Sequence, residues 1–441
     1  MGANWASQRV SLPKKASVAK FAAARRDTVA KKFKGRVLVF EAGSAKVRSN
    51  DTEYMYRAHT TFSHLTGWGS ATVPDSVLVI DARGKTPKSI LFLRETAGHN
   101  SDEFFANPAI GEFWVGKRPS LAQVAALLDV QTQSLNEYKA YLKAVPKQKV
   151  INLNKDSVLA EFVSELRFVK DSYEISEMRK AVAASVKGFE SAAKSLKQAV
   201  GHPRGERIVE TAFYAQARVE GNGLGYETIA ASGPHACTLH WITNDGPVNK
   251  NDLILLDAGV EVDSLYTADV TRTLPVSGKF TDIQRKIYDA VLEAADAAFK
   301  VAKPGVKFSD IHQAAMNVIA KKTAEWGLIG ISAEESIKQD IQLHRRWMVH
   351  GTSHHLGLDV HDCGQARREM YMDGILQPGM IFTIEPGLYF HQDDLSVPKE
   401  YRGIGVRIED DVLVTKTGVE NLTAALPRKS KDVEKWLAKL I

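Results

Sequence analysis

The chain has 441 residues, of which 44% are hydrophobic and 25% charged, a balance typical of a globular protein with two or three domains. Its apolar runs are shorter than the roughly 18–20 residues that cross a bilayer, and no hydrophobic signal segment follows Met1, so we expect no membrane partner. Two cysteines, Cys237 and Cys363, are too few for a disulfide framework and favour a cytoplasmic protein.

The net charge of +6 is concentrated near the amino-terminal end. Residues 1–50 hold twelve Lys and Arg against two Asp and Glu, which leaves a net charge of −4 for the other residues. A basic segment of this kind can contact nucleic acid or an anionic surface. The apolar residues of 19–34 have helical spacing, however, so we predict that residues 1–35 form a solvated basic helical arm with no nucleic-acid partner.

Short apolar runs alternate with helical patterns in the first third of the chain. Runs at 37–40, 77–80 and 90–93 predict buried strands, and residues 121–128 and 135–145 predict helices. This alternation indicates an α/β domain with a mixed or mostly parallel sheet. Near residues 161–175 the pattern changes, and Asp171 or Ser172 can cap a long helix over 174–200. We therefore predict two domains, at residues 1–168 and 169–441.

The second half lacks the motifs of several large enzyme classes. Residues 221–225 are glycine-rich, but Tyr226 stands where a dinucleotide fingerprint needs its third glycine. The chain also has no G-x-x-x-x-G-K-[ST], no H-E-x-x-H and no G-x-S-x-G sequence. Nucleotide-binding, zincin and serine-hydrolase functions are therefore not indicated.

The densest chemistry lies at residues 350–362, where four of the thirteen histidines stand among two glycines and two aspartates. Neutral imidazole is a common metal ligand and the usual general acid or base near neutral pH. A polar loop with hydrogen-bonded histidines is the alternative. Whether these histidines form a site or only a polar loop depends on whether carboxylates elsewhere in the chain complete the site.

Four carboxylates each lie in, or at the end of, an apolar β-like run: Asp257, Asp269, Glu385 and Glu409. A turn at 263–264 can form a hairpin that brings the two aspartates side by side. Each carboxylate alone has ordinary explanations, such as a cap or an ion pair with Arg272 or Arg407. Four in one pocket with the histidines repel one another unless they bind cations, and their charge matches two divalent ions. Oxygen-rich ligation with one histidine suits Mn²⁺, Co²⁺ or Zn²⁺.

With these motifs the chain resembles the Xaa-Pro aminopeptidase (aminopeptidase P) and prolidase family of dinuclear metallopeptidases, over residues of about 37–425. The resemblance is carried by Asp257-Ala-Gly, Asp269-Val-Thr-Arg-Thr, His350-Gly-Thr-Ser-His354, Leu358-Asp-Val-His361-Asp, Ile384-Glu385-Pro-Gly and Val406-Arg-Ile-Glu409-Asp. It implies an α/β (α+β) fold, in which a creatinase/aminopeptidase P-like α/β domain precedes a pita-bread metallopeptidase domain.

The resemblance also implies roles for particular residues. The ligands of two divalent ions, Mn²⁺ first and Co²⁺ or Zn²⁺ as alternatives, would be Asp257, Asp269, His354, Glu385 and Glu409, with Asp269 and Glu409 bridging. Catalytic roles fall on Glu385, His350 and His361. Substrate-binding positions are His240, Asp51, Trp114 and Arg407, of which Arg407 would brace the site. The family usually has eleven residue steps between the two aspartates, and this chain has twelve, which we interpret as a loop variation within 260–266.

The function that the resemblance implies is hydrolysis of the amino-terminal Xaa-Pro bond of peptides by a hydroxide that bridges two metals, in a homodimer or homotetramer. Prolidase, which cleaves only dipeptides, is the alternative within the family, although the run from Gly351 to His361 is more similar to aminopeptidase P. A creatinase-type hydrolase or a non-catalytic peptide-binding protein on the same scaffold would have lost ligands, whereas all five are present here.

Overall fold

The computed structural model describes residues 1–6 and 11–441, and the chain forms two compact units. Unit 1 comprises residues 1–164 with 263–265, and unit 2 comprises residues 165–262 and 266–441. This division falls four residues before the boundary predicted from sequence. No helix among the described residues combines the length and the apolar character needed to cross a bilayer.

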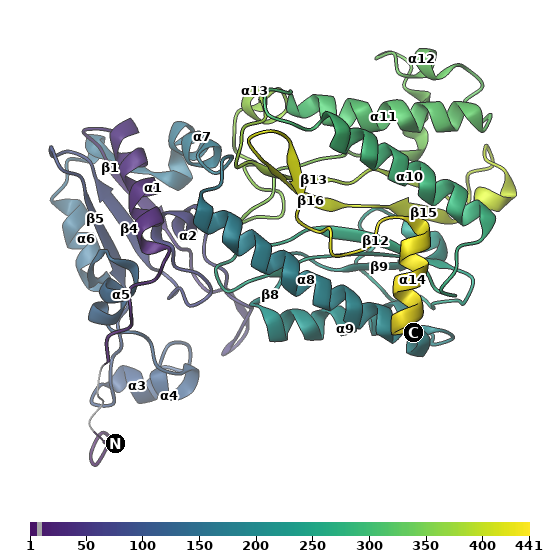
Figure 1. Ribbon diagram of the computed structural model, residues 1–441. Coiled ribbons are helices and arrows are strands. Elements are labelled where there is room, and N and C mark those ends of the chain that lie inside the picture. Colours follow the sequence, from purple (N-terminus) through teal and green to yellow (C-terminus); the bar gives the residue numbers. More distant parts are fainter. Residues whose placement is uncertain (7–10) are drawn as a thin grey trace. The chain divides into compact units, whose positions relative to one another are not determined.

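Unit 1 is built around a mixed five-stranded sheet in the order β6-β5-β4-β1-β7 (Figure 1). The β1–β4 and β4–β5 pairs are antiparallel, whereas β1–β7 and β5–β6 are parallel, so the predicted mixed sheet is confirmed. Valines of β1 and β4 pack with Phe92 and with helix α6 to form its core. The strands are β1 (Val37–Glu41), β2 (Val47–Ser49), β3 (Thr52–Glu53), β4 (Val77–Asp81), β5 (Lys88–Leu93), β6 (Gln131–Ser134) and β7 (Val150–Asn152).

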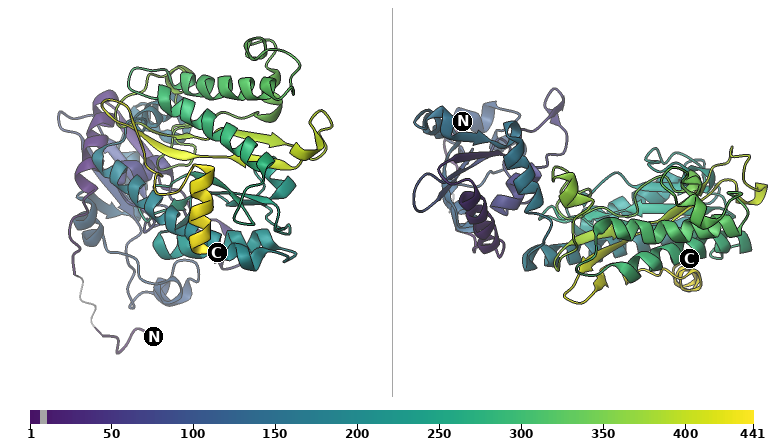
Figure 2. Two further views of the ribbon diagram at one scale, coloured as in Figure 1. Left: turned by 45° about the vertical axis from the view of Figure 1, so that its right-hand side comes forward. Right: turned by 90° about the horizontal axis from the view of Figure 1, so that it is seen from above.

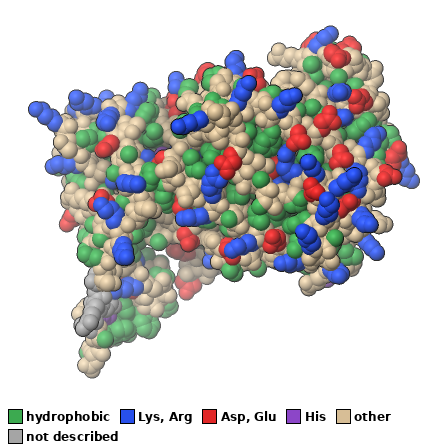
Figure 3. Space-filling view, in the orientation of Figure 1, with side chains coloured by type: hydrophobic (Ala, Val, Ile, Leu, Met, Phe, Trp, Pro, Cys, Tyr) green, Lys and Arg blue, Asp and Glu red, His purple; other side chains and the backbone are tan. Residues whose placement is uncertain are grey.

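Among the helices of the amino-terminal part, the first one differs from the sequence prediction. They are α1 (Ala19–Lys32), α2 (Thr60–Thr66), α3 (Asp102–Ala106), α4 (Glu112–Val115), α5 (Leu121–Leu128), α6 (Leu135–Lys143) and α7 (Ser157–Glu165). Helix α1 is not a solvated arm, because Arg25 and Arg26 are buried and donate to the backbone oxygens of His64 and Leu65, each at 2.9 Å. Those oxygens belong to the last turn of α2, where a helix leaves carbonyl groups without intrahelical partners. On the face shown in Figure 3, Lys and Arg side chains are spread over the surface and alternate with acidic ones.

In unit 2, strands lie between two packed helix pairs, α8 with α9 and α10 with α11 (Figure 1). Seen from above, the α10–α11 pair covers the strands (Figure 2). The helices are α8 (Ser172–Ala199), α9 (Gly205–Glu220), α10 (Asp282–Val301), α11 (Phe308–Glu325), α12 (Ala333–Ser336), α13 (Arg368–Tyr371) and α14 (Ser430–Leu440). Asp171 caps α8 as predicted, since its carboxylate accepts from the backbone nitrogens of Tyr173 and Glu174.

A hairpin of β10 and β12 lies at the centre of unit 2. Asp257 in β10 pairs with Thr271 in β12, and Asp269 directly precedes β12, so the two aspartates are diagonal neighbours on one face. The predicted hairpin is thus confirmed. The strands of unit 2 are β8 (Gly223–Leu224), β9 (Ile229–Ser232), β10 (Leu253–Ala258), β11 (Val260–Glu261), β12 (Val270–Pro275), β13 (Ile381–Ile384), β14 (Gly387–Phe390), β15 (Ile404–Arg407), β16 (Asp410–Val414) and β17 (Val419–Asn421).

The β-like run that contains Glu409, residues 405–414, is divided between two sheets in the structure. Its first part, β15, pairs with β14, and its second part, β16, pairs with β13 and β17. Both partners of this ribbon break at the same level, at Glu385–Pro386 and at Ile408–Glu409. Pro386 has no N–H to continue the ladder, and its carbonyl oxygen accepts from the backbone nitrogen of Ile408 at 3.3 Å. The break leaves both glutamates outside the regular strands.

Candidate metal centre and substrate pocket

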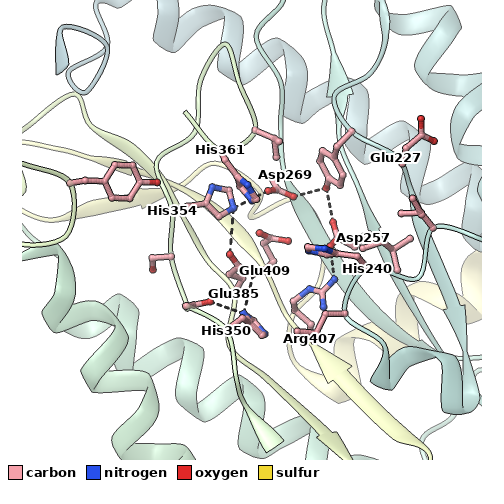
Figure 4. Close-up of a pocket in the computed structure, with 18 residues that line it drawn as sticks. Glu227, His240, Asp257, Asp269, His350, His354, His361, Glu385, Arg407 and Glu409 are labelled. Carbon is pink, nitrogen blue, oxygen red and sulfur yellow. Dashed lines mark hydrogen bonds and ion pairs between the residues drawn. The ribbon is translucent and has the colours of Figure 1, made fainter. Parts of the chain in front are cut away.

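A pocket of about 680 Å³ in unit 2 collects most of the site residues predicted from sequence (Figure 4). Its lining includes His240, Asp257, Asp269, His350, His354, His361, Glu385, Arg407 and Glu409. The other two predicted residues lie in unit 1. Asp51 is exposed beside β3, and Trp114 is an exposed residue of α4 whose Nε1 donates to the backbone oxygen of Phe105 at 2.8 Å.

The five predicted metal ligands converge from four strand ends and one loop. Ligand atoms of Asp269, His354 and Glu409 lie within 4.8 Å of one another. His354 Nε2 is 3.2 Å from Asp269 Oδ2 and 3.4 Å from Glu385 Oε1. Asp257 is linked to this group through a tyrosine described below.

The backbone around β13 and β12 places these ligands. The nitrogen of Thr383 donates to the oxygen of His354, so the histidine segment runs beside β13 toward Glu385. On the opposite side, the nitrogen of Glu409 donates to the oxygen of Thr271 at 3.1 Å. The Thr271 hydroxyl then donates to Glu409 Oε2 at 2.7 Å, which orients that carboxylate.

The electrostatics of the pocket fit divalent cations. Burial, followed by the charges of Asp269, Glu385 and Asp257, raises the pKa of Glu409 well above its usual range. Burial also raises the pKa of Glu385 to about 7, and it raises the pKa of Asp257 despite the charge of Arg407. The carboxylates therefore repel one another's negative charge, and ions of charge +2 would neutralise it.

The pKa of His354 reflects the same excess of negative charge in the pocket. Burial opposes the imidazolium form, but the hydrogen bond to Asp269 and the charges of Glu385 and Asp269 outweigh it and raise the pKa of His354 to about 9. A proton on this ring occupies the place that a metal ion would take, since a ligating imidazole must be neutral. The donor set, four carboxylates and one imidazole, is therefore suited to hard or borderline divalent ions.

Tyr226 is a site residue that sequence reasoning did not identify. Its hydroxyl lies 2.6 Å from Asp257 Oδ1 and 2.5 Å from Asp269 Oδ1, so it bridges the two aspartates. Burial, then the charges of Asp257 and Asp269, raise the pKa of Tyr226 well above its usual range, which keeps the phenol protonated. In the sequence it is marked only by the glycines before it, which carry no indication of a ligand contact.

Arg407 and Tyr389 connect the metal ligands to His350. Arg407 donates through Nη2 to Asp257 Oδ2 at 2.5 Å, through Nε to the Thr271 hydroxyl at 3.1 Å, and through Nη1 to the Tyr389 hydroxyl at 3.1 Å. The Tyr389 hydroxyl is also 2.7 Å from His350 Nε2. Because guanidinium can only donate, the tyrosine proton points to His350. Arg407 is thus held between Asp257 and Tyr389, and Tyr389 is a second residue that sequence reasoning missed.

Two further histidines stand at the pocket. The ring of His361 is edge-on to that of His354, with centroids 4.3 Å apart. Burial, then the charge of His354, lowers the pKa of His361. His240 lines the same pocket, on the side away from His354 and His361 in Figure 4. Both cysteines are free thiols, and burial raises the pKa of each to about 12.

Comparison with known proteins agrees with this geometry. The profile of metallopeptidase family M24 matches residues 176–416, and that of the aminopeptidase P N-terminal domain matches residues 22–152. Xaa-Pro aminopeptidase 1 of Streptomyces coelicolor is 46% identical, over all of this chain and 91% of its own length. The Xaa-Pro aminopeptidase of Escherichia coli is 32% identical, over 90% of this chain and 92% of its own.

Solved structures show the same similarity in three dimensions. Aminopeptidase P of E. coli with the inhibitor Pro-Leu matches with a TM-score of 0.82 at 28% identity, over 98% of this chain and 99% of that one. A zinc-substituted form of the E. coli enzyme in complex with product matches with a TM-score of 0.81. The chain therefore belongs to metallopeptidase family M24, among its metal-dependent Xaa-Pro aminopeptidases.

Proposed function

We propose that Asp257, Asp269, His354, Glu385 and Glu409 hold two divalent metal ions, and that this centre removes the first residue from peptides with proline at position two. The observation that carries the proposal is the convergence of four carboxylates and one imidazole on one pocket, with the pKa of Asp257, Glu385 and Glu409 raised. We propose Mn²⁺ as the resident ion, with Co²⁺ or Zn²⁺ as alternatives, because oxygen-rich sites accept several ions. The zinc-substituted form of the E. coli relative supports this range.

Divalent ions in this site would lower the pKa of a bound water and polarise the scissile carbonyl group. The protein residues supply the proton transfer. Glu385 lies between two histidines, with Oε1 3.4 Å from His354 Nε2 and Oε2 3.7 Å from His350 Nδ1. We assign to Glu385 the transfer of a proton from the attacking water to the proline nitrogen, which must be protonated as it leaves.

The remaining histidines would bind and orient the substrate. His361 and His350 face the pocket beside the metal ligands, and we propose that they stabilise the oxyanion of the tetrahedral intermediate and hold the proline side of the peptide. His240, on the opposite side, would contact the peptide there. Asp51 and Trp114 are proposed, from the resemblance alone, to add substrate contacts.

Four finer properties belong to the same proposal. The domains would be residues 1–168 and 169–441, the assembly a homodimer or homotetramer, and the location cytoplasmic. The preferred substrates would be longer than dipeptides. The Xaa-Pro aminopeptidases that match nearly the whole chain support the last point.

One assay tests the proposal directly. Metal-free protein supplied with Mn²⁺ should cleave an Xaa-Pro-Zaa tripeptide faster than the matching Xaa-Pro dipeptide, and no cleavage should occur when proline is replaced by alanine. Faster turnover of the dipeptide would instead support prolidase. Co²⁺ and Zn²⁺ in parallel samples identify the ion that gives the highest kcat/KM.

Removal of one ligand tests the metal assignment. His354→Ala should lose metal and turnover together, because the other ligands are carboxylates and only this imidazole completes the set. His391→Ala is the matched control, since His391 is exposed and outside the pocket lining. Full activity of a His354→Ala sample with a normal metal content would contradict the proposal.

A further inference from the structure

One wall of the pocket is a segment without regular structure. Leu239, His240 and Ile242 line the pocket and lie between the short 3₁₀ helix Gly233–Cys237 and β10. His240 is exposed, and within the described part of the chain its ring has no hydrogen bond of its own. The position of this ring therefore depends on what holds the backbone on either side of it.

One buried carboxylate contacts this segment at four points. Glu206, in the first turn of α9, has no exposed surface. Its Oε1 accepts from the Ser232 nitrogen and faces His235 Nδ1, both at 2.8 Å. Its Oε2 accepts from Trp241 Nε1 at 2.9 Å and from the Gly246 nitrogen at 2.7 Å. All four partners belong to residues 232–246, so this one side chain ties both ends and the middle of the wall.

Packing reinforces the same arrangement. The rings of His235 and Trp241 stack on each other with centroids 3.9 Å apart and planes 23° from parallel. A Cβ at Gly246 would lie 2.5 Å from His235 Cε1 and 2.9 Å from Glu206 Oε2, so only glycine lets this backbone nitrogen approach the carboxylate. Trp241 directly follows His240, and its ring is therefore the contact through which the carboxylate reaches the pocket histidine.

The chemistry of the partners requires an acceptor at both oxygens. The Ser232, Trp241 and Gly246 nitrogens can only donate, and they approach both sides of the carboxylate. An amide at this position would turn an NH₂ group toward at least one N–H donor. Glu206→Gln thus changes the hydrogen bonding of the wall while it keeps the size of the side chain.

We propose that Glu206 is a positioning residue for substrate binding, because it holds the segment that presents His240 to the peptide. The inference rests on the proposed substrate contact of His240. Glu206 touches neither the metal ligands nor the pocket, so its effect on turnover must pass through the wall segment.

The test compares Glu206→Gln, His240→Ala and the double variant in the full-length, metal-loaded protein with a proline-containing tripeptide. His240→Ala should raise KM, and Glu206→Gln should raise KM about 10-fold, the lower end of what losing an orienting partner costs. The double variant should have the KM of His240→Ala within about threefold, since residues that act through one another are not additive. Metal content and kcat should change little.

Two further variants complete the design. Trp241→Phe keeps the aromatic stack but removes one donor, and it should give a smaller rise in KM if Glu206→Gln does not fold. Glu261→Gln is the matched control, because Glu261 is buried, accepts from Asn222 Nδ2 at 2.8 Å and lies outside the pocket lining. It should leave KM unchanged.

The outcomes distinguish the substrate contact of His240 from the positioning role of Glu206. If His240→Ala leaves KM unchanged, the proposed role of His240 is wrong. If His240→Ala raises KM but Glu206→Gln and Trp241→Phe do not, the positioning role of Glu206 is wrong. The positioning role is also wrong if the KM increases of the two single variants multiply in the double variant. It is wrong as well if Glu206→Gln lowers thermal stability without changing KM.

Discussion

The hydrogen bonds at the two nitrogens of His350 determine which of them carries the proton. The oxygen of Gly351 lies 2.6 Å from Nδ1 and can only accept, so the proton of the neutral imidazole is on Nδ1. Nε2 then accepts from the Tyr389 hydroxyl, which in turn accepts from Arg407. Burial, then the charge of Arg407, lowers the pKa of His350 to about 3, so the ring is neutral at pH 7. A neutral ring in one tautomer is an oriented dipole beside Glu385.

Tyr389→Phe should therefore lower kcat/KM by about 10–100-fold, the usual cost of removing a group that orients a site from outside. Without the hydroxyl, Arg407 loses one acceptor and His350 Nε2 loses its donor, so the ring is held only by the hydrogen bond from Nδ1 to Gly351. Steady-state kinetics of the metal-loaded variant measure the effect. Tyr401→Phe is the control, because its hydroxyl accepts from Lys286 Nζ and lies outside the pocket lining. Unchanged kcat/KM in Tyr389→Phe would contradict the orienting role of the Tyr389 hydroxyl.

At the scale of elements, the segment before α8 is tied to the histidine loop by a buried ionic cluster. Asp362, next to His361, accepts from Arg167 Nε at 2.9 Å and from Lys170 Nζ at 3.0 Å. Burial favours the neutral acid, but the charges of Lys170 and Arg167 outweigh it and hold the pKa of Asp362 well below its usual range. The carboxylate thus connects the start of the catalytic unit with the loop that carries His361.

Asp362→Asn should destabilise the protein by about 3–5 kcal/mol at pH 7, because it removes the negative charge that faces two buried cations. The folded-state pKa of Asp362 lies below the unfolded value of about 3.9, so its contribution is present above that pH and declines as the pH falls below it. Urea unfolding of metal-free samples should show a difference between wild type and variant that shrinks below about pH 4.

Asp432→Asn is the control for this prediction. Asp432 pairs with Lys435 at 3.3 Å, both side chains are exposed, and the loss of this pair should cost no more than about 1 kcal/mol. Equal destabilisation by the two substitutions would show that the buried cluster contributes no more to the free energy of unfolding than a surface ion pair does.

Elements and ligands differ in how far the sequence predicts them. The strand before Asp257 and the hairpin to Asp269 follow from apolar runs and a turn, and both are found. The division of 405–414 between two sheets was missed, because the alternation of Val406 and Ile408 continues across the break and only the partner's Pro386 interrupts the pairing. Burial of Arg25 was missed because its partner, a helix-end carbonyl, leaves no mark in the sequence.

The hydrogen bonds that tyrosine hydroxyl groups make at the proposed metal site could not be predicted from the sequence either. Tyr226 and Tyr389 are separated from their partners by 18 to 43 residues. Nothing in the sequence distinguishes a tyrosine that bridges two aspartates from one that only packs in a core. The five proposed ligands could be singled out because each lies beside a short, distinctive flank, and the pocket brings them together. Residues that act through the ligands have no such flank.

At the scale of the whole molecule, the proposed metal site lies in one of the two units. The described residues contain one group of three ligand atoms close enough for an ion, and it lies in unit 2. Its members are attached to β12, β16 and the segment beside β13. Metal binding should therefore stabilise the strands of unit 2 directly, whereas the five-stranded sheet of unit 1 carries no ligand.

Hydrogen exchange with and without Mn²⁺ tests this assignment. At a metal concentration 100 times the dissociation constant, a native-state ligand adds about 2.7 kcal/mol of stability, so amides that exchange through opening of the site should slow by about 100-fold. We expect this protection in β10, β12, β13 and β16, and little change in β1, β4 and β5. His354→Ala should show none of it. Protection of equal size in both units would mean that the two units open together, and protection confined to unit 1 would contradict the placement of the metals.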